Sequence, residues 1–214
     1  IEEIKLNPAG TASGSLINAA KLGLNCLSVA SVGSDEKGDF ILNYYKRLGI
    51  DCSMKQITDA AQTSATILPI RSNGERPALH CRGASDHLFV KEDDFDKVCD
   101  AKVLHHGGTG LLNAMDRGQS AKLLKYAKAK GLTVTFDLIA PDTETVELLK
   151  PILPHVDYFM PSMEEAEILC DELVILSHGK TLLQGPPKQL IADAGVSDLD
   201  TLFLSLTGET LVKT

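Results

Sequence analysis

The sequence predicts an α/β fold in three layers, in which helices cover both faces of a largely parallel β-sheet. Short apolar segments alternate with amphipathic segments of helical period along most of the chain, an order that is typical of strand–helix–strand crossovers. Glycine follows several of the helical segments, where it ends a helix at low cost. The 214 residues are 43% apolar and 23% charged, which is the composition of a globular protein with a core of useful size.

The first part of the chain begins this alternation and then interrupts it with a hairpin. The expected elements are helices over 12–23 and 37–48, a strand over 26–32, and hairpin strands over 63–70 and 78–81. In the second helix Phe40, Ile41 and Tyr44 recur at helical spacing, and Gly49 ends it. The turn sequence at 72–75 separates the two hairpin strands, so we expect them to pair.

The alternation resumes after residue 100. We expect strands over 103–106, 132–138 and 156–160, and helices over 120–130, 143–149 and 163–169. The tail predicts a hairpin with a His-Gly turn (173–176 and 181–184), a helix that begins with proline (186–192), and a final helix capped at Ser197. Because no flexible linker precedes the tail, we expect domains at 1–168 and 169–214, with the second packed on the first.

Charge and cysteine content exclude several classes of protein. The net charge is -8, which argues against a nucleic-acid partner or an anionic membrane surface. No apolar run approaches a membrane span, and residues 1–5 do not form a signal peptide. Five cysteines without a CxxC pair predict free, mostly buried thiols, no zinc, and a cytoplasmic location. A first residue other than Met suggests a fragment.

Two glycine-containing segments near the N-terminus carry the first functional signal. Ala9-Gly-Thr-Ala-Ser-Gly14 precedes a helix that contains Asn18, and glycines there let a hydroxylated ligand approach the backbone. A simple strand-to-helix turn explains the same residues. The second segment, Ser31-Val-Gly-Ser-Asp-Glu-Lys-Gly-Asp-Phe40, has the pattern VGxDxxG between a strand and a helix. Its acidic residues Asp35 and Asp39 also suit the start of a helix by complementing the helix dipole.

Together these segments resemble the ribokinase-like (PfkB) carbohydrate kinases, a resemblance that covers residues 1 to about 168. It implies a three-layer ribokinase-like fold and ATP-dependent phosphorylation of a sugar or sugar-like hydroxyl with Mg²⁺, and neither zinc nor haem. It places Gly10, Thr11, Gly14 and Asn18 near the sugar. Ala9 and Gly14 depart from the family, which usually has Gly and Asn at these positions.

The hairpin at about 63–85 resembles the lid of the same family. The resemblance implies lid roles for Thr66, Arg76 and Arg82, and a homodimer formed through the hairpin. A lid suits phosphoryl transfer, because closing it excludes water that would otherwise accept the phosphate. An ordinary exposed hairpin with a charged turn is the alternative interpretation.

Three further positions have competing interpretations. Glu165 stands at the family's metal- and phosphate-proximal glutamate, with Ser162 where the family has Asn. A carboxylate suits Mg²⁺ held largely through water, but Ser162 and Glu165 also have the spacing of a capping box. His105 and His106 are adjacent on a strand and should face opposite ways, which makes them poor partners for one metal ion. Asp137 ends a strand, where it would orient a loop or make a structural hydrogen bond.

The C-terminal part lacks the residues that would complete a kinase. No GxGD-type loop, which in the family supplies the catalytic base and an anion hole, occurs after residue 170. Residues 163–214 instead resemble the C-terminal end of an ABC-transporter ATP-binding subunit, on the pattern of Asp171, Gly179, Gly185 and Pro187, without a Walker motif. The sequence therefore predicts a carbohydrate kinase relative that is catalytically incomplete. The alternative is a non-catalytic chimera or fragment that acts at most as a sugar-binding or interaction module.

Overall fold

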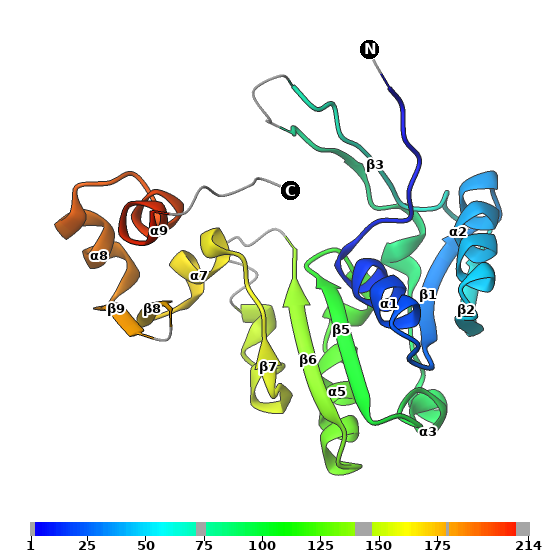
Figure 1. Ribbon diagram of the computed structural model, residues 1–214. Helices are drawn as coiled ribbons and strands as arrows, with labels where there is room; N and C mark the ends of the chain where they lie inside the picture. The colour runs from blue at the N-terminus through cyan, green and yellow to red at the C-terminus, as the bar shows by residue number, and fades with distance from the viewer. Residues whose placement is uncertain (1–2, 72–75, 140–146, 179, 209–214) are drawn as a thin grey trace. The chain divides into compact units, whose positions relative to one another are not determined.

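A computed structural model describes residues 3–71, 76–139, 147–178 and 180–208 (Figure 1). The chain divides into two compact units, Ile1–Phe159 and Met160–Thr214, and each is described by itself below. The domain limits predicted from the sequence, 1–168 and 169–214, stay a prediction. The helix expected over 143–149 lies largely outside the described residues. Its last part, 147–149, is described and is helical.

The N-terminal unit follows the predicted order of elements. In chain order they are α1 (Thr11–Lys21), β1 (Leu27–Gly33), α2 (Glu36–Arg47), β2 (Asp51–Thr58), β3 (Ala65–Ile67), β4 (Leu79–Cys81), the 3-10 helices η1 (Gly83–His87) and η2 (Glu92–Asp94), α3 (Phe95–Val98), β5 (Val103–Thr109), α4 (Asn113–Asp116), α5 (Gln119–Ala129), β6 (Thr133–Leu138), η3 (Leu153–His155) and β7 (Tyr158–Phe159). Each predicted strand and helix in this list starts within two residues of its expected position.

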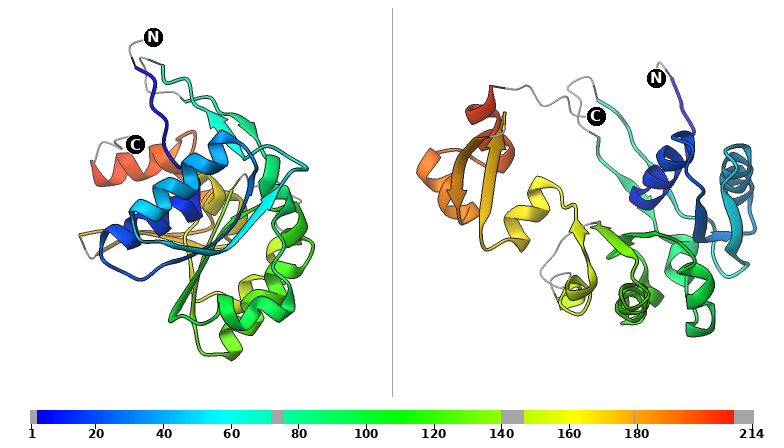
Figure 2. Two further views of the ribbon diagram at one scale, coloured as in Figure 1. Left: turned by 90° about the vertical axis from the view of Figure 1, so that its right-hand side faces the viewer. Right: turned by 60° about the horizontal axis from the view of Figure 1, so that its bottom comes forward.

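Parallel strands form the framework of this unit. β5, β6 and β7 make one parallel sheet, and β1 and β2 make a parallel pair. Helix α1 lies on one face of β5 and β6, and α5 lies on the other (Figure 2). The arrangement confirms the predicted α/β class with helices on both faces of parallel strands.

The core between α5 and the sheet follows from the two-residue period of β6. Val134, Phe136 and Leu138 all point to one face and are buried, as are Leu123 and Leu124 of α5. The intervening residues of β6 are half-buried on the opposite face, toward α1. β6 therefore offers an apolar face to one helix and a more polar face to the other.

A bulge in β5 changes which residues face the core. The parallel register pairs His106 with Phe136 and Thr109 with Leu138. Between these two pairs β5 therefore contains one residue more than β6. As a result His106 and Thr109 are both buried on the α5 face, although three residues separate them. The bulge falls at Gly107 and Gly108, where it lets Gly107 face α1.

Strand β2 is the element that sequence patterning missed. Of its eight residues only Met54 is buried, and polar or charged residues occupy most other positions. A strand at the border of a sheet needs few apolar residues, so its hydrophobic signal is weak. The 3-10 helices and the four-residue helices α3 and α4 were also not predicted, because they are too short to show a period.

The predicted hairpin is present, but its paired part is short. β3 and β4 are antiparallel, with Ala65 opposite Cys81 and Ile67 opposite Leu79. Figure 1 shows the hairpin extending from the N-terminal unit next to α2 and β1. We call residues 63–85 the lid hairpin; its turn at 72–75 lies outside the described residues.

The C-terminal unit has its own small core. It contains α7 (Met163–Leu169), β8 (Leu173–Ser177), β9 (Lys180–Gly185), α8 (Pro187–Ala194) and α9 (Leu199–Thr207). The antiparallel pair β8–β9 confirms the predicted hairpin, and Pro187 stands in the first turn of α8. Four buried residues, Ile175, Leu190, Leu199 and Leu202, form the core of this unit.

Two predictions about the whole chain can be compared with the structure. All five cysteines are free, but only Cys99 is buried and the other four are half-buried, so the expectation of mostly buried thiols was wrong. Among the described residues there is no helix with the length and apolar character that a membrane crossing requires.

Candidate functional site

The N-terminus of α1 lies directly against β5. A side chain at Gly107 would place its Cβ 2.8 Å from Thr11 Oγ1 and 3.1 Å from the backbone nitrogen of Ala12. Both distances are shorter than normal contacts, so only glycine fits. The close approach puts Thr11 and the free N–H groups of the first turn of α1 beside the C-terminal half of β5, where parallel α/β sheets bind ligands.

Polar side chains line the sheet face beneath α1. His105 Nδ1 lies 2.9 Å from Thr135 Oγ1, and Asp137 follows on the same face of β6. Thr11 Oγ1 and His105 Nε2 are both buried, and neither has a hydrogen-bond partner among the described residues. Buried polar atoms are normally hydrogen-bonded, so these two are available to a polar ligand or to water.

Electrostatics keep the His105 side chain neutral near pH 7. Burial lowers the pKa of the His105 imidazole, while the negative charge of Asp137 opposes that shift. A neutral imidazole has one donor and one acceptor nitrogen, so Nε2 can hydrogen-bond a hydroxyl group in either sense. The site therefore suits a hydroxylated ligand.

His106 has a different role. It stacks on Phe136 with the ring centroids 5.8 Å apart, on the face that packs against α5. Burial lowers the pKa of His106 to about 4, with a smaller contribution from His105. The two histidines thus face opposite ways, as predicted, and His106 belongs to the core.

The structure brings the predicted sugar-site residues onto one stripe of α1. Gly10 precedes the helix with φ 108°, a value that favours glycine, and its carbonyl accepts a hydrogen bond from Gly14 N at 2.8 Å. Thr11, Gly14 and Asn18 follow at spacings of three and four residues, which places them on the same side of the helix. Asn18 and Gly10 are exposed and Thr11 is half-buried. Their role in binding stays a prediction.

Sequence patterning did not single out Asp116, which shapes the loop after β5. The Oδ2 atom of Asp116 accepts hydrogen bonds from Gly110 N at 2.9 Å and Leu112 N at 3.1 Å, so one carboxylate shapes the loop 110–112. Burial raises the pKa of Asp116, although these two bonds act in the opposite direction. A run of glycines at 107, 108 and 110 was the only signal in the sequence for this tight loop.

The predicted lid residues are exposed and dispersed. Thr66 Oγ1 lies 2.8 Å from His80 Nδ1 across the β3–β4 pair. Arg82 precedes η1 and forms an ion pair with Asp86 at 3.0 Å. Arg76 is exposed, and it lies beside the turn that is outside the described residues.

Ser162 and Glu165 form a capping box, which was one of the two interpretations of these residues beside a position near Mg²⁺. Ser162 N donates to Glu165 Oε2 at 2.6 Å, and Glu165 N donates to Ser162 Oγ at 3.3 Å. Glu165 is buried, with 8% of its surface exposed. No group of three or more His, Cys, Asp or Glu residues that could hold a metal ion occurs within the described ranges. A single carboxylate such as that of Glu165 suits Mg²⁺ that is held largely through water.

Comparison with known proteins identifies the family. The profile of the pfkB family carbohydrate kinases matches residues 1–197, which extends past residue 168, where the sequence resemblance was placed. A probable fructokinase-5 of Arabidopsis thaliana is 26% identical over 191 residues, which cover 82% of this chain and 59% of the relative. A 5-dehydro-2-deoxygluconokinase of Shouchella clausii (strain KSM-K16) is 33% identical over 132 residues, 60% of this chain and 40% of the relative.

Solved structures show the same fold. A PfkB protein from Polaromonas sp. JS666 superposes with a TM-score of 0.66 at 23% identity, over 74% of this chain and 56% of that one. The chain spans between about 38% and 59% of the length of the curated relatives that it matches. Since the family profile covers most of its 214 residues, the chain belongs to the pfkB family of carbohydrate kinases.

Proposed function

We propose that this chain forms the sugar-binding part of a kinase that transfers a phosphoryl group from ATP to a sugar hydroxyl. The observation that carries the proposal is the contact between the start of α1 and β5 at Gly107, because it brings Thr11 next to the polar sheet face. Thr11 Oγ1 and His105 Nε2 are buried there without partners among the described residues. A sugar hydroxyl would satisfy both atoms without bringing a charge into the site.

ATP and Mg²⁺ enter the proposal through the family. Mg²⁺ in such reactions neutralises charge on the transferred phosphate and usually keeps several waters, so it needs few protein ligands. Glu165, with Ser162 beside it, is the residue of this chain that we propose near the metal and phosphates. Its Oε2 already accepts a hydrogen bond from Ser162 N, and Glu165 would act on Mg²⁺ through an intervening water.

The catalytic base is a residue that the sequence patterns do not identify. No GxGD-type loop follows residue 170, and no other carboxylate is placed by sequence in that role. The second candidate function is therefore a non-catalytic sugar-binding module, in which the α1–β5 site is retained and phosphoryl transfer is lost.

The identity of the sugar is drawn from the relatives. Several of them are fructokinases or probable fructokinases at 24–27% identity, and the Shouchella clausii enzyme is a 5-dehydro-2-deoxygluconokinase at 33%. We propose a ketose or a keto-sugar acid as the first substrate class to test. Both classes carry hydroxyl groups, which hydrogen-bond a neutral imidazole in either sense.

Two assays separate the candidate functions. Titration calorimetry measures binding of fructose and 5-dehydro-2-deoxygluconate, and a coupled assay measures ADP release with Mg-ATP. Binding with sugar-dependent ADP release would support the kinase. Binding without turnover in a folded protein would support the sugar-binding module, and absence of binding would contradict both.

The lid hairpin supports a further proposal, that two copies pair through it. Four large apolar side chains are exposed on the hairpin: Ile67, Leu68, Ile70 and Leu79. Exposed apolar groups so close together commonly mark a protein interface. Sedimentation equilibrium of the wild type and of Ile67→Glu tests the proposal, which expects a dimer in the first and a monomer in the second. A monomeric wild type would contradict it.

The origin of the C-terminal unit is a separate proposal. We propose that its hairpin and two helices derive from the end of an ABC-type ATP-binding subunit, as the order of β8, β9, α8 and α9 and the positions of Gly185 and Pro187 suggest. Because the family profile reaches residue 197, the crossover would lie inside the matched region. The gene sequence around codon 163 in related organisms tests this, and a continuous kinase gene with the same tail would contradict it.

A further inference from the structure

Three glycines pack against the first residues of the lid hairpin. A Cβ at Gly33 would lie 2.6 Å from the carbonyl oxygen of Ala61 and 2.7 Å from Thr63 N. Gly38 is packed in the same way against the carbonyl oxygen of Gly33, and Gly83 against that of Gln62. Gly33 and Gly83 therefore meet the backbone of residues 61–64 directly, and Gly38 packs on Gly33 and on the Thr63 hydroxyl, so this packing requires both glycines of the VGxDxxG pattern.

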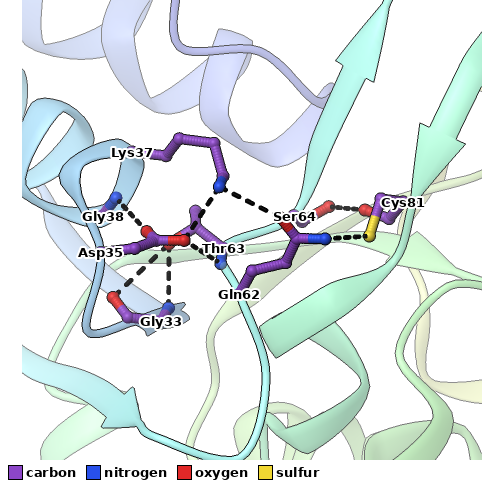
Figure 3. A network of polar contacts seen from close by, with 8 residues as sticks. All are labelled: Gly33, Asp35, Lys37, Gly38, Gln62, Thr63, Ser64 and Cys81. Atoms are coloured by element: carbon purple, nitrogen blue, oxygen red, sulfur yellow. Dashed lines mark hydrogen bonds and ion pairs between the residues drawn. The ribbon is translucent and has the colours of Figure 1, made fainter.

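Asp35 occupies the middle of this cluster. Its Oδ1 accepts hydrogen bonds from Gly38 N at 2.9 Å and from the Thr63 hydroxyl at 2.5 Å, and its Oδ2 accepts from Thr63 N at 2.9 Å (Figure 3). Lys37 Nζ adds an ion pair at 2.9 Å. Thr63 is 2% exposed, and its Oγ1 also accepts a hydrogen bond from Gly33 N at 2.9 Å. One carboxylate thus joins the start of α2 to the start of the lid hairpin, 28 residues later in the chain.

The returning strand of the hairpin is fastened to the outgoing one at the same place. Ala84 N donates to the carbonyl of Gln62 at 2.8 Å, and Ser64 Oγ donates to the carbonyl of Cys81 at 3.1 Å. Gln62 Nε2 lies 3.2 Å from Cys81 Sγ, and Lys37 Nζ lies 3.2 Å from Gln62 Oε1 (Figure 3). Both ends of the hairpin are therefore tied to β1 and α2 through Gln62 and Thr63.

We propose that Asp35 and Thr63 are positioning residues that fix the root of the lid hairpin. They hold residues 62–64 and 83–84 against the end of β1, so that any movement of the lid occurs beyond this root. The proposal rests on the proposed function, because the hairpin is a lid only if the chain binds a sugar. The two residues touch neither substrate nor nucleotide in this account. Their effect is to set where the hairpin leaves the unit.

The chemistry of the contact explains why an aspartate is needed. Four donors from three residues converge on two carboxylate oxygens, and only an ionised carboxylate accepts at both. The hydrogen bonds from Thr63 and Gly38, with the Lys37 ammonium, hold the pKa of Asp35 far below its ordinary range, so it stays charged at physiological pH. An asparagine would keep one acceptor and bring an amide donor toward the N–H and O–H donors.

A plain helix cap is the competing explanation, and substitutions distinguish it. Asp35→Ser keeps a side-chain acceptor for the first turn of α2 but is too short to reach Thr63. Thr63→Val leaves the cap intact and removes the hydroxyl with its bonds to Asp35 and Gly33. Thr63→Ser restores the hydroxyl. Asp39→Asn is the matched control, because Asp39 is an exposed acid in the same turn of α2.

Amide hydrogen exchange of the ligand-free protein tests the proposal, with global stability measured in parallel by urea unfolding. In Asp35→Ser and Thr63→Val we expect the backbone amides of residues 63 and 84 to exchange about tenfold faster than in the wild type. This factor is typical of losing a hydrogen bond to a charged group. The increase should exceed the change in global stability. Thr63→Ser and Asp39→Asn should exchange as the wild type does.

Two results would overturn the proposal. One is an unchanged Ala84 amide in Thr63→Val, and the other is acceleration that is uniform over the unit and equal to the loss of global stability. Because no sugar or ATP is present, the outcome does not depend on whether the chain binds a sugar. If the root loosens as expected but no sugar binds, Asp35 and Thr63 still fix the base of the hairpin, while the proposed function and the lid role both fail.

Discussion

At the scale of single residues, Gly107 is the position on which the proposed sugar site depends most. It is the point at which α1 and β5 touch, and a methyl group there would meet Thr11 Oγ1 and the backbone of Ala12. We expect Gly107→Ala to cost about 1–3 kcal/mol of unfolding free energy, as overpacking typically does, and to weaken sugar binding, because α1 must move away from β5. Urea unfolding and sugar titration measure the two effects.

Gly14 provides the matched comparison for Gly107. A Cβ at Gly14 would have no atom within 4 Å, and the residue is inside a helix, where alanine is favoured over glycine by about 0.5–1 kcal/mol. Gly14→Ala should therefore stabilise the protein. If it also weakens sugar binding, Gly14 belongs to the sugar pocket. If Gly107→Ala proves as stable as the wild type, the close α1–β5 contact is wrong.

His106 makes the stability of the N-terminal unit depend on pH. Its pKa is lowered from 6.5 to about 4 by burial, so between these values the unfolded chain binds a proton that the folded protein does not. The His106 contribution should lower stability by up to about 3 kcal/mol as the pH decreases from 6.5 to 4, and this contribution should level off below pH 4. His106→Leu should flatten this part of the curve.

The control for this prediction is an exposed histidine. His87→Asn changes a side chain at the end of η1 and should leave the pH dependence as in the wild type. His105 contributes in the same direction, since burial also lowers its pKa, so some slope should remain in His106→Leu. An unchanged slope in His106→Leu would show that the imidazole is not buried as described.

At the scale of elements, the capping box of α7 separates a structural role from a metal role. Ser162→Ala removes the acceptor for Glu165 N and should cost about 1 kcal/mol in the C-terminal unit. Glu165→Gln keeps a side chain that can complete the box but removes the charge. If Glu165 acts on Mg²⁺, Glu165→Gln should weaken magnesium-dependent nucleotide binding while Ser162→Ala leaves it intact. Equal effects in both variants would exclude the metal role.

Much of this fold could be predicted because local signals were strong. Periodic apolar residues located α1, α2 and α5, and glycines marked their ends. Strand β2 could not be predicted, since Met54 is its only buried residue and its polar surface resembles a loop. The bulge at Gly107 and Gly108 was missed for another reason: an extra residue in a strand changes the facing of side chains without changing the composition.

The candidate site was predictable only in part. The glycine-rich start of α1 and the VGxDxxG pattern lie in segments that the structure packs closely against other parts of the unit. The partners of these segments are far away in sequence: Thr11 meets Gly107, and Asp35 meets Thr63. Contacts between segments so far apart leave no pattern in a single sequence, so the sequence does not show which segments touch. For Glu165 the spacing to Ser162 correctly predicted the capping box.

At the scale of the whole molecule, each of the two units has buried residues of its own. Leu202 is 1% exposed in the core of the C-terminal unit. Leu202→Ala should cost about 2–5 kcal/mol there, as truncation of a buried leucine does. We expect faster amide exchange in β8, β9 and α9, with β5 and β6 unaffected. Acceleration of the same size in β5 and β6 would mean that the chain unfolds as one cooperative structure.

The central claim is that the start of α1 and the polar face of β5 and β6 form a sugar site. The most direct test is an NMR titration of the 214-residue chain with fructose and 5-dehydro-2-deoxygluconate, following backbone amides and the His105 imidazole. The account predicts saturable shifts at Thr11, Gly107 and His105 that are lost in Gly107→Ala. A folded protein whose signals at these positions do not respond to either sugar, or respond equally in Gly107→Ala, would contradict it.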